Sequence, residues 1–270
     1  MVWIEPRRPG QAQILVVLHQ QASSPGRVGL ALQQMGYALD IRRPPLGDAL
    51  PASLEEHAGA AIFGGPMSAN DPDEFVKREI DWIGVPLKEN KPFLGICLGA
   101  QMLVKHLGGE VRANAGNYAE IGYYPLEATP EGAALLDWPC QVYQWHREGF
   151  SLPAGAALLA RGEEYPNQAI RVADKAFGVQ FHAELTFAML NRWTTRGHAR
   201  LSLHGAQERR RHIEGRYLYD GAVRQWLADF LDLWVGPAHT SAGARVERSK
   251  VRAQMNAAIE KDPHSWPPSS

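Results

Sequence analysis

The stretch that decides the fold is residues 92–101, PFLGICLGAQ. An apolar run leads into Gly95-x-Cys97-x-Gly99, and a helical segment follows that ends near residues 108–109. A sharp strand-to-helix turn holds its central side chain exposed, and the flanking glycines leave room for backbone and substrate. The N–H groups at the start of the helix also favour a thiolate over a thiol. Cys97 is therefore a candidate nucleophile, although cysteine is also a common buried residue.

Earlier in the chain, the apolar runs 14–18 and 60–63 alternate with segments of helical period. Continuous apolar runs are typical of parallel strands that are buried on both faces. Parallel strands need crossover connections, which are usually helices. The first hundred residues therefore predict an α/β fold with a doubly wound, mostly parallel sheet flanked by helices.

Residues 71–89 are predicted to form one of these helices, with Asp71 as its N-cap and a kink or restart at Gly84 and Pro86. The apolar side chains on one face of this helix should form a buried stripe, and its charged side chains should stay in water. The expected stripe is Phe75, Ile80, Ile83 and Leu87, and the expected wet side chains are Lys77, Arg78, Glu79 and Lys88.

The second half of the chain predicts a small antiparallel extension of the sheet. Short strand-like stretches are separated by Gly, Pro and Asn, at residues 121–126, 141–146, 157–160, 168–172 and 176–182. A helix over 217–235 should dock on the sheet through apolar side chains, namely Leu218, Val223, Trp226, Leu227, Phe230, Leu231 and Trp234. We expect an N-terminal extension (1–11), one domain (12–235) and a flexible C-terminal tail (236–270) with a helix over 244–261.

The composition of the chain limits the classes of molecule that it is expected to bind. Lys and Arg number 28 against 29 Asp and Glu, a formal net charge of -1, so no global field attracts nucleic acid or an anionic membrane. The one basic cluster, 209–211, is more simply a solvated helix face. The two cysteines, Cys97 and Cys140, show neither metal-ligand spacing nor a disulfide framework. With no signal-peptide pattern and no membrane-length apolar run, we expect a cytoplasmic protein that binds a small molecule, without metal or cofactor.

A second chemical motif is GVQFHAE at residues 178–184. His182 and Glu184 stand two apart at the end of a predicted strand, which would put both side chains on one face. An imidazole near Cys97 could take its proton and later deliver it to a leaving amine, while the carboxylate fixes the tautomer of the imidazole. A lone histidine is more often structural, and we interpret His106, His198, His204 and His212 in that way.

The loop GGPMS at residues 64–68 follows the strand predicted over 60–63. It should therefore lie at the same carboxyl edge of the sheet as Cys97, where open α/β sheets place their ligands. We expect the N–H groups of Gly65 and Leu98 to form an oxyanion hole and Gly64 to contact the substrate. Without the neighbouring cysteine turn, this loop would be interpreted as a plain Gly-Gly-Pro turn.

Five motifs together resemble class I glutamine amidotransferases, in order and approximate spacing over residues 12–235. They are GGPMS, GICLGAQ, EIGYYPL (120–126), WHREGFSLP (145–153) and GVQFHAE. The chain is especially similar to stand-alone relatives of the GMP synthetase glutaminase domain. The resemblance implies a flavodoxin-like fold, a Cys97–His182–Glu184 triad, and attack of Cys97 on the glutamine side-chain amide to give a γ-glutamyl thioester.

The resemblance also implies that Gln101 helps to hold the substrate. Trp145 and His146 are either part of the substrate wall or hairpin packing. Three positions depart from the family pattern: Ala183 replaces a proline between His and Glu, and Arg147 and Glu148 replace a glycine and an aspartate.

Three functions remain open at this point. The first is hydrolysis of glutamine, with ammonia supplied to a separate synthetase, because the chain shows neither a phosphate-binding loop nor an ATP-pyrophosphatase motif. The second is hydrolysis of a γ-glutamyl peptide or amine through the same thioester. The third is a non-catalytic regulatory or binding module, which the presence of all three triad residues disfavours.

Overall fold

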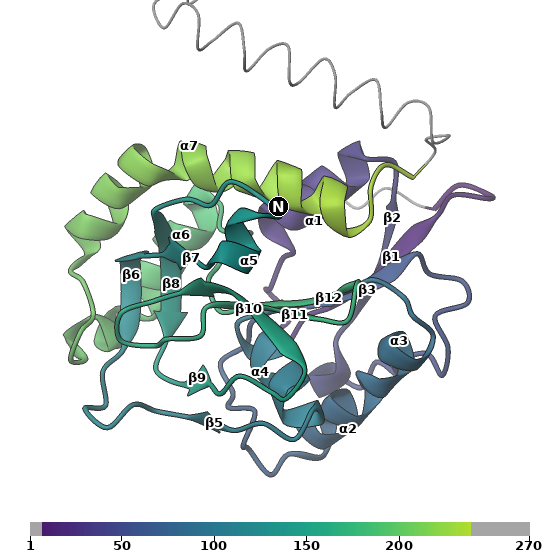
Figure 1. The fold of residues 1–270 in the computed structure, drawn as a ribbon, viewed down its shortest axis with the longest axis horizontal. Coiled ribbons are helices and arrows are strands. Elements are labelled where there is room, and N and C mark those ends of the chain that lie inside the picture. Colours follow the sequence, from purple (N-terminus) through teal and green to yellow (C-terminus); the bar gives the residue numbers. More distant parts are fainter. Residues whose placement is uncertain (1–6, 239–270) are drawn as a thin grey trace, which may run out of the picture.

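The structure, a computed structural model, describes residues 7–238, and an eight-stranded sheet lies at its centre (Figure 1). The strands of this sheet are β1 (Gln13–Val17), β2 (Ala38–Arg42), β3 (Gly59–Ile62), β4 (Phe93–Ile96), β7 (Glu127–Ala128), β10 (Ala156–Arg161), β11 (Ala169–Val172) and β12 (Ala176–Val179). They lie in the order β2-β1-β3-β4-β12-β11-β10-β7. In this order, the five strands from β2 to β12 pair in parallel. Each of β11, β10 and β7 is antiparallel to the strand before it. The parallel part has the flavodoxin-like strand order, so the predicted fold class is confirmed.

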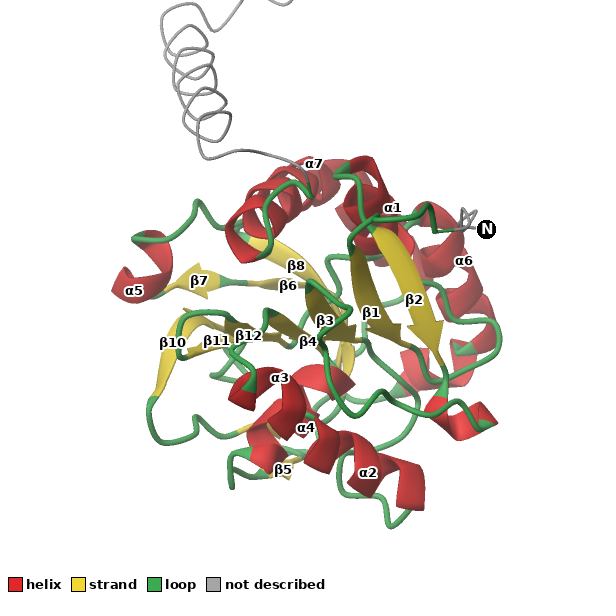
Figure 2. Ribbon diagram, turned by 90° about the vertical axis from the view of Figure 1, so that its right-hand side faces the viewer, coloured by secondary structure: helices red, strands yellow, loops and turns green. Residues whose placement is uncertain are grey.

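Helices cover both faces of the sheet, as the two perpendicular views show (Figures 1 and 2). One face carries α1 (Gly26–Gln34) and α7 (Arg209–Trp234), and the other carries α2 (Glu74–Trp82), α3 (Gly84–Lys88) and α4 (Leu98–His106). Along β1, Ile14 and Val16 lie in the core under α1 and α7, whereas Leu15 and Val17 lie in the core under α2 and α4. Burial on both faces explains why the strand is continuously apolar.

The remaining elements flank the main sheet. Two antiparallel pairs are formed by β5 (Val111–Arg112) with β9 (Gly149–Phe150) and by β6 (Glu120–Pro125) with β8 (Gln141–His146). The short helix α5 (Pro130–Ala133) packs on β10, and α6 (Phe187–Arg196) follows β12. Two 3-10 turns complete the set, η1 (Pro44–Leu46) and η2 (His198–Ser202). The predicted strands 121–126 and 141–146 therefore pair with each other in a sheet of their own.

The helix predicted over 71–89 differs from the prediction at its start. It begins at Glu74, and Asp71 is not its N-cap, because the Asp71 carboxylate accepts a hydrogen bond from the Ser68 N–H instead. Such local side-chain to backbone bonds compete with helix capping. The predicted restart near Gly84 and Pro86 is confirmed, since α2 ends at Trp82 and α3 begins at Gly84.

The buried face of α2 also differs from the predicted stripe. Val76, Glu79 and Trp82 are the buried residues of this helix, whereas Phe75 and Ile80 are only partly buried. The prediction that Glu79 stays in water is wrong: its side chain is fully buried and pairs with His19. A carboxylate can be buried when a hydrogen-bonded partner compensates its desolvation.

The boundaries of two further elements differ from the predicted ones. The strand predicted to reach His182 ends at Val179, and α7 begins at Arg209 rather than 217. Leu218 is 71% exposed and does not pack on the sheet, although the other six apolar side chains predicted for this helix are buried. The first turns of α7 are rich in charged residues, so hydrophobic periodicity could not detect them.

Residues 239–270, which include the helix expected over 244–261, and residues 1–6 lie outside the described part, so the proposed domain limits stay a prediction. Within residues 7–238, no helix has the length and apolar character needed to span a membrane.

Candidate active site

Cys97 sits at the turn from β4 to α4 in a strained backbone conformation. Its φ is 51° and its ψ is -105°, a region that residues other than glycine rarely adopt, at a cost of about 1–3 kcal/mol. A Cβ on Gly95 would lie 2.5 Å from the Gly99 backbone, and a Cβ on Gly99 would overlap the carbonyl oxygen of Ile62. The two glycines are therefore required by the close approach of β3, β4 and α4.

His182 and Glu184 lie in the loop that follows β12, and both are buried. The His182 N–H donates to the Tyr143 carbonyl at 2.8 Å, and His182 Nδ1 lies 2.7 Å from Glu184 Oε1. The two side chains thus meet, but the predicted reason was wrong, because the strand ends before either residue. A turn, rather than the period of a strand, brings them together.

The charges around His182 favour its protonated form. Burial of the ring disfavours the charge, but the negative charge of Glu184, that of Cys97 and hydrogen bonds to both side chains outweigh it and raise the pKa of His182 to about 10. Within residues 7–238, His182 Nε2 has no oxygen or nitrogen partner. This nitrogen is therefore the one that can exchange a proton at Cys97.

The Gly64–Gly65 loop lies against the side chains of Cys97 and His182. A Cβ on Gly64 would be 3.0 Å from His182 Cε1 and 3.5 Å from the Cys97 Cβ, so a larger residue would press on both. The Gly65 N–H is free of strand pairing because β3 ends at Ile62. Leu98 is the first residue of α4, so its N–H has no acceptor within the helix.

A buried pair that the sequence did not reveal supports this loop. His19, just after β1, places Nδ1 3.2 Å from the Gly64 carbonyl oxygen and Nε2 2.9 Å from Glu79 Oε2. Because the Gly64–Gly65 peptide is planar and trans, holding its carbonyl turns the Gly65 N–H away from His19. A histidine and a glutamate 60 residues apart carry no local signal that predicts their pairing.

The loop of Glu184 is held from both neighbouring helices. The Arg27 N–H donates to the Glu184 carbonyl at 2.9 Å, and the Arg27 guanidinium donates to the Leu185 carbonyl and to Asp220. Arg216 donates to the same Leu185 carbonyl at 3.2 Å. These bonds restrain the turn at Ala183, where the family pattern has the rigid φ of proline.

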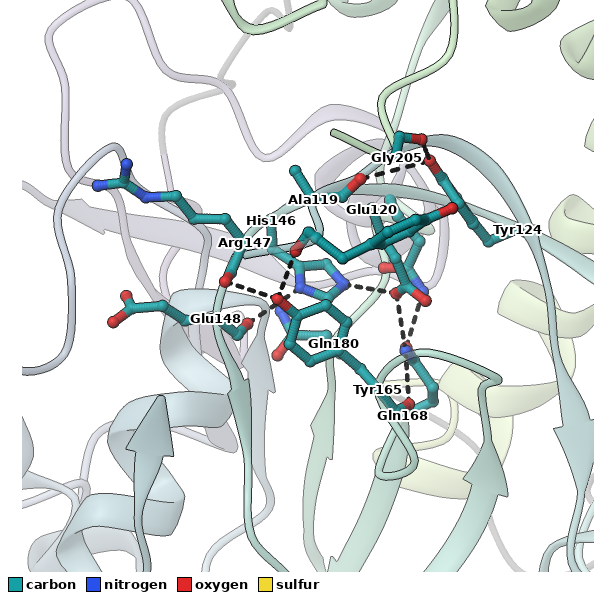
Figure 3. A network of polar contacts seen from close by, with 12 residues as sticks. Ala119, Glu120, Tyr124, His146, Arg147, Glu148, Tyr165, Gln168, Gln180 and Gly205 are labelled. Atoms are coloured by element: carbon teal, nitrogen blue, oxygen red, sulfur yellow. Dashed lines mark hydrogen bonds and ion pairs between the residues drawn. The ribbon is translucent and has the colours of Figure 1, made fainter. Parts of the chain in front are cut away.

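Gln101 and His146 do not reach the cavity at Cys97 but converge on one backbone oxygen. The Glu148 carbonyl accepts from Gln101 Nε2 at 2.8 Å and from His146 Nδ1 at 3.0 Å. His146 Nε2 lies 2.9 Å from Glu120, whose carboxylate also accepts from Gln168 (Figure 3). In the same view the Arg147 and Glu148 side chains extend away from this network. Of the two predicted wall residues, His146 is thus part of the packing.

A cavity of about 510 Å³ opens at Cys97. Its wall includes Gly64, Gly65, His182, Glu184 and Trp145, while Leu98, Gln101 and His146 lie outside it. The Trp145 ring packs 5.8 Å from that of Trp193 on α6, which lines the same cavity. Within residues 7–238, no cluster of His, Cys, Asp and Glu is arranged to hold a metal ion.

Comparison with known proteins gives a consistent picture. The family model for class-I glutamine amidotransferases matches residues 30–191. The glutamine amidotransferase-like protein YfeJ of Salmonella typhimurium is 31% identical over 180 residues, which is 63% of this chain and 74% of that protein. GMP synthase of Aeropyrum pernix is 32% identical over 164 residues, 60% of this chain but only 31% of that enzyme.

Solved structures agree with the sequence relatives. A glutamine amidotransferase from Thermotoga maritima is 30% identical with a TM-score of 0.75, covering 83% of this chain and 98% of its own. A glutamine amidotransferase from Methylobacillus flagellatus is 25% identical with a TM-score of 0.77, covering 86% and 97%. The chain therefore belongs to the class I glutamine amidotransferase family, whose members are usually glutamine-hydrolysing enzymes.

Proposed function

We propose that this protein hydrolyses the γ-amide bond of glutamine or of a related γ-glutamyl amide, with Cys97 as nucleophile and His182 and Glu184 as its proton-transfer pair. One observation carries the proposal. A buried imidazole, hydrogen-bonded to Glu184 through Nδ1 and with its pKa raised to about 10, has only Nε2 left to interact with Cys97 at its strained turn. This matches the nucleophile, base and orienting acid of acyl-transfer sites.

The reaction balances with these three residues and water. The Cys97 sulfur bonds to the γ-carbonyl carbon, and the C–N bond breaks as His182 gives its proton to the leaving nitrogen. Water then attacks the γ-glutamyl thioester, His182 takes a proton from this water, and the thiolate leaves as glutamate is released. Glu184 stabilises the charged imidazole and fixes its orientation throughout.

Negative charge develops on the carbonyl oxygen during both steps, and the N–H groups of Gly65 and Leu98 would stabilise it. Losing one such donor costs on the order of 3 kcal/mol of transition-state stabilisation. Gly64 and Trp145, which line the cavity, would contact the substrate directly. Gln101 and His146 would act through the Glu148 backbone that both hold.

The fate of ammonia depends on the substrate. If glutamine is the substrate, a separate synthetase subunit is the proposed acceptor partner, and the similarity of 60% of this chain to a 31% portion of the Aeropyrum pernix GMP synthase supports this proposal. Adding such a subunit should then raise glutamine turnover, whereas an enzyme for larger γ-glutamyl compounds would need no partner.

The test is steady-state release of glutamate from glutamine and from a panel of γ-glutamyl amides. We expect turnover by the wild type and by Cys140→Ala, the matched control in an exposed cysteine, and none by Cys97→Ala. Release that is equal in wild type and Cys97→Ala, or absent from both with every substrate, would overturn the proposal and favour a non-catalytic module.

A further inference from the structure

Three arginines line the same cavity on the side of α6 and η2. They are Arg192, Arg196 and Arg200, and among the described residues the only carboxylate in the wall is Glu184, which is engaged with His182. Arg192 donates to the Ala22 carbonyl at 2.7 Å. Within residues 7–238, none of the three guanidinium groups forms an ion pair. On a chain of net charge -1, this wall is locally cationic.

The arginines lie on the side where a leaving group must sit. His182 protonates the departing nitrogen, so the leaving group has to lie next to the imidazole. The Trp193 ring contacts the His182 ring edge-on at 4.9 Å, and Trp193 is on α6 between Arg192 and Arg196. A group attached to the departing nitrogen would therefore meet Trp193 first and the arginines beyond it.

The cavity is also larger than ammonia release requires. Pockets of roughly 300–1,000 Å³ enclose drug-sized molecules, and glutamine is much smaller than these. A volume of about 510 Å³ leaves room for a γ-glutamyl group and a further organic group at the same time. The second group would lie between the aromatic rings and the guanidinium groups of Arg196 and Arg200, which are exposed, and this setting is suited to an anion on a short apolar stem.

We infer that the natural leaving group is an amine that carries an anionic group such as a carboxylate, bound by Arg196 and Arg200 beside the Trp145–Trp193 wall. The inference rests on the proposed hydrolysis and names its substrate class: a γ-glutamyl amide of an anionic amine. The bond that breaks is the same γ-amide bond, the nitrogen leaves with the His182 proton, and the anionic group is unchanged.

The experiment compares substrates that differ only in the charge of the leaving amine. γ-Glutamylglycine carries a carboxylate, γ-glutamylglycinamide is its neutral isostere, and γ-glutamyl-aminomethylphosphonate carries a phosphonate. Glutamate release is measured for each, with Cys97→Ala as the blank. We expect kcat/KM to be about tenfold higher for an anionic amide than for the neutral one, as charge-assisted hydrogen bonds predict. Comparison of the carboxylate with the phosphonate identifies the preferred anion.

Variants link this preference to the arginines. Arg196→Gln and Arg200→Gln should each lower the ratio of kcat/KM for γ-glutamylglycine to that for γ-glutamylglycinamide, and the double variant should bring it close to one. A ratio cancels any general loss of active protein. Arg161→Gln is the matched control, because Arg161 is exposed on β10 and lies outside the cavity wall. Raising the salt concentration should reduce the wild-type ratio, since exposed charges are screened.

Three outcomes distinguish failure of the anionic leaving group from failure of the proposed hydrolysis. No Cys97-dependent release from any substrate would overturn both. Cys97-dependent release with equal kcat/KM for the charged and neutral amides would leave the hydrolase standing and overturn the anionic leaving group. A wild-type ratio in the double arginine variant would also overturn the anionic leaving group bound by these arginines.

Discussion

Two buried histidine–glutamate pairs lie against Gly64, and they differ in the partner of the second imidazole nitrogen. In the pair His182–Glu184, Nδ1 is bound to the carboxylate and Nε2 has no oxygen or nitrogen partner in the described part of the chain. In the pair His19–Glu79, one ring nitrogen faces the carboxylate and the other faces the Gly64 carbonyl. The first imidazole can therefore exchange a proton, whereas the second is fully engaged.

Neither burial nor residue type distinguishes the histidine that can exchange a proton from the histidine that supports the loop. Both pairs are buried and both combine the same two side chains. Only the partner of the second ring nitrogen tells them apart. His146 resembles His19 in its surroundings, because its Nε2 lies 2.9 Å from Glu120 and its Nδ1 lies 3.0 Å from the Glu148 carbonyl oxygen.

The largest effect should come from breaking the pair that exchanges protons. Glu184→Gln removes the charge that stabilises the His182 imidazolium, and we expect the kcat of glutamate release to fall about 10⁴-fold, as for a triad acid. Circular dichroism should show that the fold is retained. A loss of less than about tenfold would contradict the role of Glu184 in proton transfer.

Breaking the supporting pair should have a smaller and different effect. Glu79→Gln weakens the hold of His19 on Gly64, so we expect kcat to fall about tenfold with little change in KM, because an oxyanion donor acts mainly in the transition state. The free energy of unfolding should fall by about 1–3 kcal/mol. Both are measured by steady-state kinetics and urea unfolding.

Asp81→Asn is the control for Glu79→Gln, since this carboxylate is exposed on the same helix and should have no effect on either quantity. A rise in KM with an unchanged kcat would show that His19 and Glu79 serve substrate binding rather than the oxyanion loop.

The protonation of His182 gives a pH dependence with a definite sign. Its pKa is raised from 6.5 to about 10 in the folded protein, so the stabilisation is fully present below pH 6.5 and is lost as the pH rises through about 10. Urea unfolding across this range should show the decline. In Cys97→Ala, which lacks one of the charges, NMR titration should give a lower pKa for His182; an unchanged pKa would mean that Cys97 carries no charge beside it.

The smallest effect should come from the helix that follows the proton-transfer pair. The Thr186 hydroxyl caps α6 by accepting from the Met189 N–H at 3.2 Å, and Thr186→Ala should lower the free energy of unfolding by about 1 kcal/mol. Urea unfolding measures this. Thr195→Ala, in an exposed position of the same helix, should cost nothing, and an equal loss in both variants would contradict the capping role.

Local patterns in the sequence predicted much of the fold and part of the candidate site. The apolar runs predicted the parallel strands, because burial on both faces demands them. The glycine spacing around Cys97 predicted the strand-to-helix turn, because no larger side chain fits there. His182 and Glu184 were predicted as partners because they are neighbours in the chain, although the strand that was to align them ends earlier.

Tertiary structure alone decided which polar groups meet across distant segments. The burial of Glu79, the contact of His19 with Gly64 and the hold of Arg27 on the Glu184 loop all join elements far apart in sequence. It also turned His146 into a packing group and gathered arginines of α6 and η2 at the cavity. Periodicity and spacing report only neighbours along the chain, whereas the compensation of a buried charge depends on what the fold places beside it.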